Sequence, residues 1–352
     1  MEEQKNVDSD KPKRLFYMDI ARFIAIFFMV FSHVGLMYGT EEYLNSLFGL
    51  IIDVMAGAPA APVFMFSMGF FVVFTKKTDL KKGIKRGLRI FIAGIVLNLV
   101  RYILPVFLGY LFDIVKEPLY GYAIGESFLF LLFEVDILLF AGLAYCLIII
   151  LIQYRPKISL PLAFIVVAIL SPSLWGIYVD NVAFDIMLDL LWGNRAHVAF
   201  PIFPWLCYPI LGAWIAKMMF FSDKSKSSIK RVVFIGFALF FVGGIIILLD
   251  FENQLSNYYL SRPGAVFAYS GFVILWILGI KNISYLFKGK IRQLIIFTST
   301  NLTSIYCIHW IILGWLIWFL PMNGLGLWNI IVIFIILFPL SLLLSRYIKI
   351  KL

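Results

Sequence analysis

Long apolar segments alternate with short polar connections along the whole chain. A membrane-spanning helix needs about 20 mainly apolar residues, and about ten segments meet that criterion. The pattern predicts an all-α fold, a polytopic membrane helix bundle, with a cytoplasmic tail at residues 1–15 before a single transmembrane domain at residues 16–352. The predicted helices lie near residues 16–38, 47–75, 88–112, 128–153, 159–178, 200–221, 231–250, 263–281, 292–320 and 327–346.

Basic residues are concentrated in every second connection between the predicted helices. The other connections carry only Lys116, Arg195 and Arg262 and are richer in acids. Because loops rich in lysine and arginine stay in the cytoplasm, this distribution predicts that both termini are cytoplasmic, as an even number of spans requires. The basic connections contain Lys76, Lys77, Lys81, Lys82, Lys85, Arg86, Arg89, Arg155, Lys157, Lys217, Lys224, Lys226, Lys230, Arg231, Lys281, Lys288, Lys290 and Arg292.

Composition supports a membrane protein and changes how the net charge is interpreted. Of 352 residues, 62% are hydrophobic and 14% are charged, whereas about a quarter of the residues in a soluble domain are charged. The net charge of +10 would suggest nucleic acid for a soluble protein. Here we attribute the net charge to the cytoplasmic loops. We therefore expect the lipid bilayer as a partner and do not expect a nucleic acid. The three cysteines lie in apolar runs, which does not support a disulfide framework.

The second predicted helix contains a motif that should kink or break it. Two prolines fall within Gly57-Ala-Pro59-Ala-Ala-Pro62, and a proline inside a helix removes a hydrogen bond and clashes with the preceding turn. A broken helix at membrane depth is tolerated only against protein or a wet cavity. The motif therefore indicates either a cavity wall or a simple packing kink.

Three polar side chains interrupt the first apolar segment. Asp19, Arg22 and His33 are costly inside a membrane, so we interpret them as functional. At roughly 1.5 Å and 100° per residue, Arg22 and His33 share a helix face and lie about 16 Å apart along the axis. Asp19 precedes Arg22 by one turn and can pair with it.

These residues also carry a resemblance to a known family. The pattern D-x-x-R from Asp19 to Arg22, followed after ten residues by His33, resembles the first-helix signature of the acyltransferase-3 family of membrane-bound acyltransferases. Phe200 to Gly212 and Ser304-Ile-Tyr306-Cys-Ile-His309 resemble segments of the wider transmembrane acyltransferase superfamily, which includes heparan-alpha-glucosaminide N-acetyltransferase. The stretch from Gly57 to Gly69 resembles the glycan N-acetyltransferase branch but has no histidine nearby, so that branch's chemistry is not carried over.

The resemblance implies roles for the residues of the first helix. His33 would be the general base or would itself accept the acyl group, because imidazole titrates near neutrality. Arg22, with Asp19 beside it, would contact the acyl coenzyme A donor, since a guanidinium suits planar anions. The alternatives are a structural histidine bonded to another helix and an Asp19–Arg22 pair that only anchors the helix.

Other intramembrane polar residues fall at a similar depth and predict a polar chamber in the outer half of the bundle. Arg101 should pair with Asp53, Glu134 or Asp136. Glu134 and Asp136 would point to different helix faces, so at most one should join a given pocket. Structural ion pairing and interfacial packing remain alternatives for the whole group. The predicted substrate-binding residues are Arg101, Asp53, Glu134, Asp136, Arg195, His197, Trp205, Tyr306 and His309.

A basic cluster follows the second predicted helix. Its members Lys81, Lys82, Lys85, Arg86 and Arg89 would bind the phosphates of coenzyme A, or else only orient the protein and contact anionic lipids. The sequence contains no P-loop and no H-E-x-x-H motif. Three histidines on widely separated segments predict no metal site.

These observations predict an integral membrane acyltransferase of the cell membrane of a bacterium. It would move an acyl group, in the first place acetyl, from cytoplasmic acetyl-CoA or another acyl-CoA to a hydroxyl or amine of an extracytoplasmic glycan or similar acceptor. The alternatives are a transporter of a glycan or lipid-linked intermediate, which also uses buried charges and broken helices, and a sensor or assembly subunit without catalysis. The acceptor, the acyl chain length and the oligomeric state stay open.

Overall fold

A computed structural model describes residues 14–75, 78–115, 126–195, 198–220 and 225–350. In these ranges the regular elements are helices, and the extended contacts are two isolated bridges. The helices are α1 Phe16–Tyr38, α2 Glu41–Leu44, α3 Leu47–Ala56, α4 Ala61–Phe74, α5 Leu80–Asn98, the π-helix η1 Leu99–Ile103, α6 Leu104–Leu111, α7 Glu126–Leu132, α8 Ile137–Leu151, α9 Pro156–Leu174, α10 Val182–Trp192, α11 Ile202–Trp205, α12 Cys207–Phe220, α13 Ser225–Leu249, α14 Phe251–Gln254, α15 Pro263–Ile283, the 3-10 helix η3 Ser284–Leu286, α16 Gly289–Thr300, α17 Leu302–Leu316 and α18 Leu327–Leu344.

Length and apolar composition support the predicted membrane bundle. Among the described residues, eight helices are long and apolar enough to cross a membrane, and a ninth span results if the bent pair α16–α17 is counted as one. The predicted segment 128–153 is shorter than expected, because its apolar helix α8 has only 15 residues. The protein is therefore an all-α polytopic membrane protein.

Four predicted helices are interrupted. The segment 47–75 breaks at residues 57–60, as its glycine and prolines predicted. The segment 292–320 is bent by 75° between α16 and α17, the segment 128–153 divides at residues 133–136, and the segment 200–221 begins with the short helix α11. Continuous helices were predicted for the segments 128–153, 200–221 and 292–320, and these three predictions were wrong.

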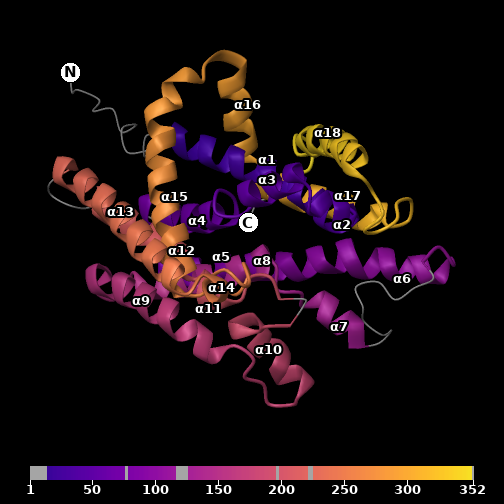
Figure 1. Ribbon diagram of the computed structural model, residues 1–352, viewed down its shortest axis with the longest axis horizontal. Helices are drawn as coiled ribbons and strands as arrows, with labels where there is room; N and C mark the ends of the chain where they lie inside the picture. Colours follow the sequence, from indigo (N-terminus) through magenta and orange to yellow (C-terminus); the bar gives the residue numbers. More distant parts are fainter. Residues whose placement is uncertain (1–13, 76–77, 116–125, 196–197, 221–224, 351–352) are drawn as a thin grey trace, which may run out of the picture.

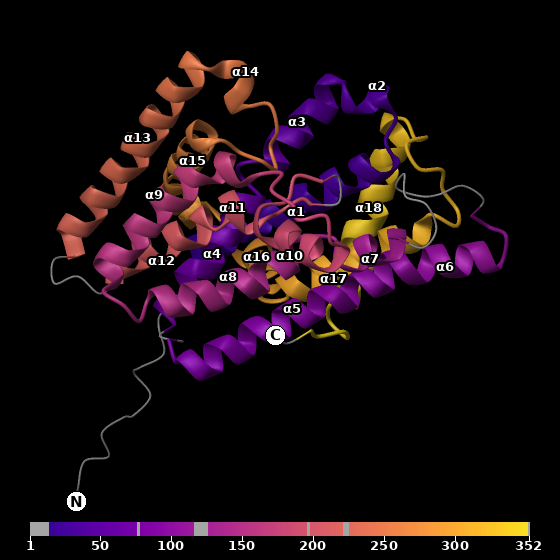
Figure 2. The ribbon, with the colours of Figure 1, turned by 90° about the horizontal axis from the view of Figure 1, so that it is seen from below.

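The third span is longer than its hydropathy indicated. It begins at Leu80 and continues through α5, η1 and α6 as one rod along one side of the molecule, with α8 packed beside α5 (Figures 1 and 2). The first turns of α5 carry basic side chains on an exposed face, so their mean hydropathy is low although the opposite face is buried. The apolar criterion alone therefore placed the start of this helix too late.

Helix α1 lies at the centre of the bundle, and most of its residues are buried. The close contact between its neighbour α4 and α12 relies on glycine, because a Cβ atom at Gly69 would overlap the carbonyl oxygen of Pro209. The central place of α1 puts both ends of its polar face inside the protein. Its helical neighbours include α3, α4, α15, α16, α17 and α18.

Candidate active site

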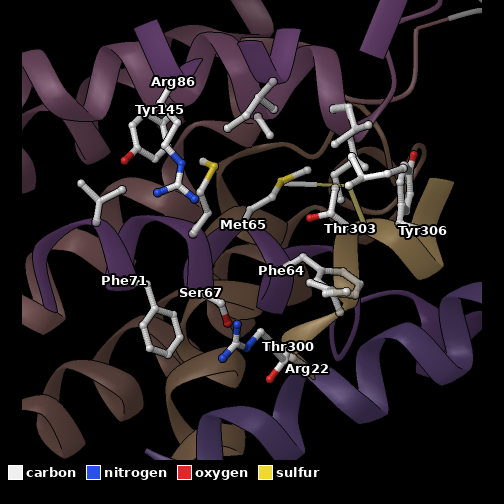
Figure 3. A pocket seen from close by; sticks show the side chains of 18 of the residues that line it. Arg22, Phe64, Met65, Ser67, Phe71, Arg86, Tyr145, Thr300, Thr303 and Tyr306 are labelled. Carbon is white, nitrogen blue, oxygen red and sulfur yellow. The ribbon is translucent and has the colours of Figure 1, made fainter. Parts of the chain in front are cut away.

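Two cavities meet at the start of α8. The first, which we call the arginine cavity, has a volume of about 500 Å³. Arg22 of α1 and Arg86 of α5 supply its charged side chains, and α4, α8 and the start of α17 complete it. Its other lining residues include Phe64, Met65, Ser67, Phe71, Tyr145, Thr300 and Thr303 (Figure 3).

The second cavity, which we call the histidine cavity, has a volume of about 600 Å³. His33 of α1 lines it together with two acids, Asp53 and Asp136. The broken region after α3 forms part of its wall, as the cavity-wall interpretation of that motif predicted. Aromatic and small polar residues complete the lining and include Phe200, Ser256, Asn257, Tyr258, Tyr259 and Tyr269.

Two residues line both cavities and form the wall between them. Ile137 is the first residue of α8, and Tyr306 lies in the second turn of α17. The hydroxyl of Tyr306 donates a hydrogen bond to Asp136, and Asp136 also accepts from the backbone N–H of Ile137 at 2.6 Å. The wall is thus held by the carboxylate that caps α8.

Arg22 is held by an ion pair and still reaches the arginine cavity. Its Nη2 lies 3.1 Å from Oδ1 of Asp19, and its guanidinium carbon lies 4.5 Å from the centre of the Phe71 ring. Asp19 is buried and also accepts from Arg14 at 2.6 Å and from Ser299 at 2.7 Å. Asp19 lines neither cavity, so it positions Arg22, and the predicted Asp19–Arg22 pair is present.

Arg86 is the member of the basic cluster that enters the arginine cavity. Its Nε atom is buried without a hydrogen-bond partner, and its guanidinium carbon lies 5.4 Å from the centre of the Tyr145 ring. Arg86 and Arg22 reach into the cavity from opposite walls (Figure 3). The other cluster members face the surroundings of the bundle and are exposed: Lys81, Lys82, Lys85 and Arg89.

His33 and His309 form a direct contact behind the histidine cavity. Nδ1 of His33 lies 3.0 Å from Nε2 of His309, whose Nδ1 in turn lies 3.0 Å from the carbonyl oxygen of Ile305. His33 is partly accessible at the cavity, whereas His309 is fully buried and does not line it. The ring of Trp310 packs on His33 with a centroid distance of 4.2 Å.

Arg101 is buried on η1 and pairs with one of the three predicted acids. Its Nη1 lies 2.7 Å from Oδ2 of Asp136, and Oδ1 of Asn98 accepts from its Nε and Nη2. Glu134 instead accepts from the hydroxyl of Tyr102 at 3.2 Å and does not line the histidine cavity. One acid of the two therefore joins the cavity, as predicted, although both lie in the break between α7 and α8 and not on a helix.

Arg195 lies away from both cavities. Its Nη2 pairs with Asp185 at 2.8 Å, its Nη1 approaches Asp189 at 3.4 Å, and its guanidinium carbon lies 4.0 Å from the centre of the Tyr178 ring. The backbone N–H of Val179, and then Arg195, hold the pKa of Asp185 below its ordinary value. This group ties α10 to the segment before it.

The remaining predicted residues also differ in whether they line the histidine cavity. Asp53 is exposed and lines the histidine cavity without pairing to Arg101. Trp205 is buried behind that cavity, where its Nε1 donates to the carbonyl of Tyr259 at 2.7 Å. His197 lies outside the described residues.

Sequence reasoning did not select several residues that shape the site. Asn98 precedes Arg101 by three residues in an apolar span, and that spacing could have identified it as a partner. Tyr258 and Tyr259 form an aromatic pair in a connection between two helices, and this signal was available too. Tyr145, Thr303 and Trp310 carry no such signal, because single aromatic and hydroxyl residues are common in apolar helices.

The architecture therefore defines an integral membrane helix bundle with polar cavities at the two ends of its first helix. The family model described as an acyltransferase domain matches residues 15–348, so the chain belongs to the acyltransferase-3 family and is a membrane acyltransferase. A comparison with curated proteins gave no match.

Proposed function

We propose that the protein transfers an acetyl group from acetyl-CoA in the arginine cavity to a hydroxyl or amine of a glycan in the histidine cavity. The arginine cavity would open to the cytoplasm and the histidine cavity to the outer side, in keeping with the distribution of basic loops. The observation that carries the proposal is that the two cavities meet at Ile137 and Tyr306. A thioester at this wall would be within reach of both cavities.

The charge of the arginine cavity supports a phosphorylated donor. Arg22 and Arg86 face each other across the cavity, and Arg86 retains a buried Nε without a partner. Guanidinium groups bind phosphate oxygens with paired, charge-assisted hydrogen bonds. A pantetheine arm could then follow the apolar lining, such as Met65 and Phe64, towards Tyr306.

The lining of the histidine cavity supports a neutral polyhydroxylated acceptor. Tyrosine rings and Asn257 combine apolar faces with hydrogen-bonding groups, which suits a sugar. Apart from His33, the residues found to line the cavity include no basic side chain, and Asp53 adds a negative charge. This favours a neutral or cationic acceptor over a phosphorylated one.

His33 would supply the proton transfer. Its imidazole takes the proton of the acceptor hydroxyl as that oxygen attacks the thioester carbonyl and forms a tetrahedral intermediate. The intermediate collapses, the carbon–sulfur bond breaks, and the leaving thiolate of coenzyme A takes the proton back from the imidazolium. The products are the acetyl ester and free coenzyme A, and His33 returns to its neutral form.

Calorimetry with acetyl-CoA on the detergent-purified protein tests the donor. Arg86→Ala should weaken binding roughly tenfold to a hundredfold, because a charge-assisted contact contributes about 1.5–3 kcal/mol. Arg89→Ala removes an exposed arginine one turn further along α5 and should change the affinity less than about twofold. Equal affinities for the two variants would remove Arg86 from the donor site.

A coenzyme A release assay with candidate glycans then tests the reaction. His33→Ala should bind acetyl-CoA as the wild type does, since His33 lines the other cavity. It should lose turnover by roughly a hundredfold or more, the contribution of a general base. If a folded wild-type sample binds no acyl-CoA at all, the donor assignment fails, and the acyl group must come from a different class of donor.

A further inference from the structure

The contact between His33 and His309 fixes which ring nitrogen of each histidine carries the proton. A backbone carbonyl oxygen only accepts hydrogen bonds. Nδ1 of His309 lies 3.0 Å from the carbonyl oxygen of Ile305, so this nitrogen must donate. A neutral imidazole has one N–H, and Nε2 of His309 is therefore an acceptor.

The same reasoning continues to His33. Nε2 of His309 lies 3.0 Å from Nδ1 of His33, and with Nε2 as the acceptor, Nδ1 of His33 must donate. The second nitrogen of His33 is then left without a proton. Because Nδ1 is turned to His309 and the ring lines the histidine cavity, Nε2 is the nitrogen that remains for the cavity.

Packing holds both rings in these positions. His309 is fully buried, its ring lies 5.4 Å from that of Tyr306, and the ring of Trp310 lies 4.2 Å from that of His33. A histidine whose partner is fixed has a fixed tautomer. Without His309, nothing among the contacts described for His33 would prevent the Nε2–H tautomer, which presents a donor to the cavity and cannot take a proton there.

We propose that His309 is a positioning residue that, anchored by the carbonyl of Ile305, holds His33 in the Nδ1–H tautomer and so makes Nε2 of His33 the base of the histidine cavity. When Nε2 takes the acceptor's proton, the His33 imidazolium keeps its hydrogen bond from Nδ1 to the neutral ring of His309. A hydrogen bond is stronger when its donor is charged than when it is neutral, so this bond stabilises the transition state. This kinetic role rests on the proposed function, whereas the tautomers do not.

Nitrogen NMR of the histidine-labelled protein tests the tautomers without any substrate. The chain has three histidines, so removing them one at a time assigns each ring. In the wild type, His33 and His309 should both show a protonated Nδ1 and an unprotonated Nε2. In His309→Phe, the signal of His33 should shift towards the Nε2–H form. A protonated Nε2 on neutral His33 in the wild type would overturn the proposal.

Turnover measurements then test the consequence. His309→Phe should lower kcat roughly a hundredfold and leave the KM values for donor and acceptor within about twofold, because His309 lines neither cavity. His309→Gln places an amide oxygen where Nε2 was and should restore most of kcat. Equal losses in the two variants, with both shown to be folded by their thermal unfolding, would contradict a positioning role.

The two experiments separate the possible failures. If no acyl donor supports turnover but the NMR spectrum shows both Nδ1–H tautomers, the proposed function fails and the hydrogen-bonded pair stands. If turnover is found and His309→Phe retains full kcat, the proposed function stands and His309 has no part in it.

Discussion

At the scale of single residues, Asp136 combines a structural contact with a place in the cavity wall. It pairs with the buried Arg101 at 2.7 Å, accepts from Tyr306, caps α8 and lines the histidine cavity. Burying an arginine is costly, and the energy is recovered only while the guanidinium has its carboxylate. The residue therefore links the stability of the bundle to the shape of the wall between the cavities.

Replacing the Asp136 carboxylate by an amide should destabilise the protein, although the side chain keeps its size. Asp136→Asn leaves the Arg101 charge uncompensated, and the loss of one partner of a buried pair costs about 3–5 kcal/mol. The measurement is the midpoint of chemical unfolding in detergent. Asp53→Asn, an exposed acid of the same cavity, serves as the control and should stay within about 0.5 kcal/mol. Similar midpoints for the two variants would show that Arg101 does not depend on Asp136.

At the scale of elements, breaks in the helices determine where the site residues lie. The break between α7 and α8 turns Asp136 towards Arg101, and backbone N–H groups of Ala199 and Phe200 both donate to the carbonyl of Val135 at 3.0 Å. Outside the cavities, Arg195 holds α10 by its two acids. The two backbone bonds to Val135 take the place of hydrogen bonds that a continuous helix would have made.

The segment around α10 should lose its order when Arg195 is removed. Arg195→Ala should raise amide exchange across residues 178–195 at neutral pH, while Asp180→Asn, a change at an exposed acid of the same segment, should not. Because the pKa of Asp185 is lowered from 3.8, its stabilising contribution is present above that pH and is lost as the pH falls through the lowered value. Once the intrinsic pH dependence of amide exchange is divided out, the protection of this segment in the wild type should thus be steady from pH 7 to 5 and fall below about pH 4. Equal exchange in both variants would contradict this.

Sequence patterns captured the elements whose cause is local. The bounds of α1 agree with the predicted 16–38, and the break at Gly57 to Pro62 follows from its prolines. The break before α8 was missed, because both of its flanks are apolar and it is held by a distant bridge between Val135 and Val198. The bend after α16 lies in the polar stretch from Thr298 to Ser304, a signal that the hydropathy criterion did not use.

The sequence predicted which types of residue form the candidate site better than which of them contact one another. The sequence identified Arg101 and its three possible acids, but only the fold decides for Asp136. It identified the basic cluster, but not that Arg86 alone of its five members lines the arginine cavity, because the helix had to start at Leu80 for its faces to be assigned. The wall residue Ile137 looks like any other apolar residue in the printed sequence.

At the scale of the whole molecule, α1 places a cation at one cavity and an imidazole at the other. Arg22 and His33 share a helix face, yet they serve separate cavities that meet only at Ile137 and Tyr306. This arrangement gives the proposed reaction a direction, because donor and acceptor do not need to enter from the same side.

Sealed vesicles can reveal this direction. Acetyl-CoA does not cross a bilayer. Added donor should therefore support acetylation in inside-out vesicles that enclose the acceptor, and it should fail in right-side-out vesicles that have the acceptor in their medium. Opening the vesicles with detergent should make the two preparations equal. Equal activity before opening would contradict a donor cavity confined to the cytoplasmic side.

Transfer across the wall of Ile137 and Tyr306, as proposed, also has a consequence for the membrane voltage. In the proposed reaction, an acetyl group leaves the cytoplasmic thioester for an outer oxygen, and the hydrogen of that oxygen ends on the cytoplasmic thiol. Formally, an acylium unit moves outward while a proton moves inward, and the two charges cancel. The electrical potential would then neither drive nor oppose turnover, and a cell that had lost its potential could still modify its outer glycans for as long as it made the thioester.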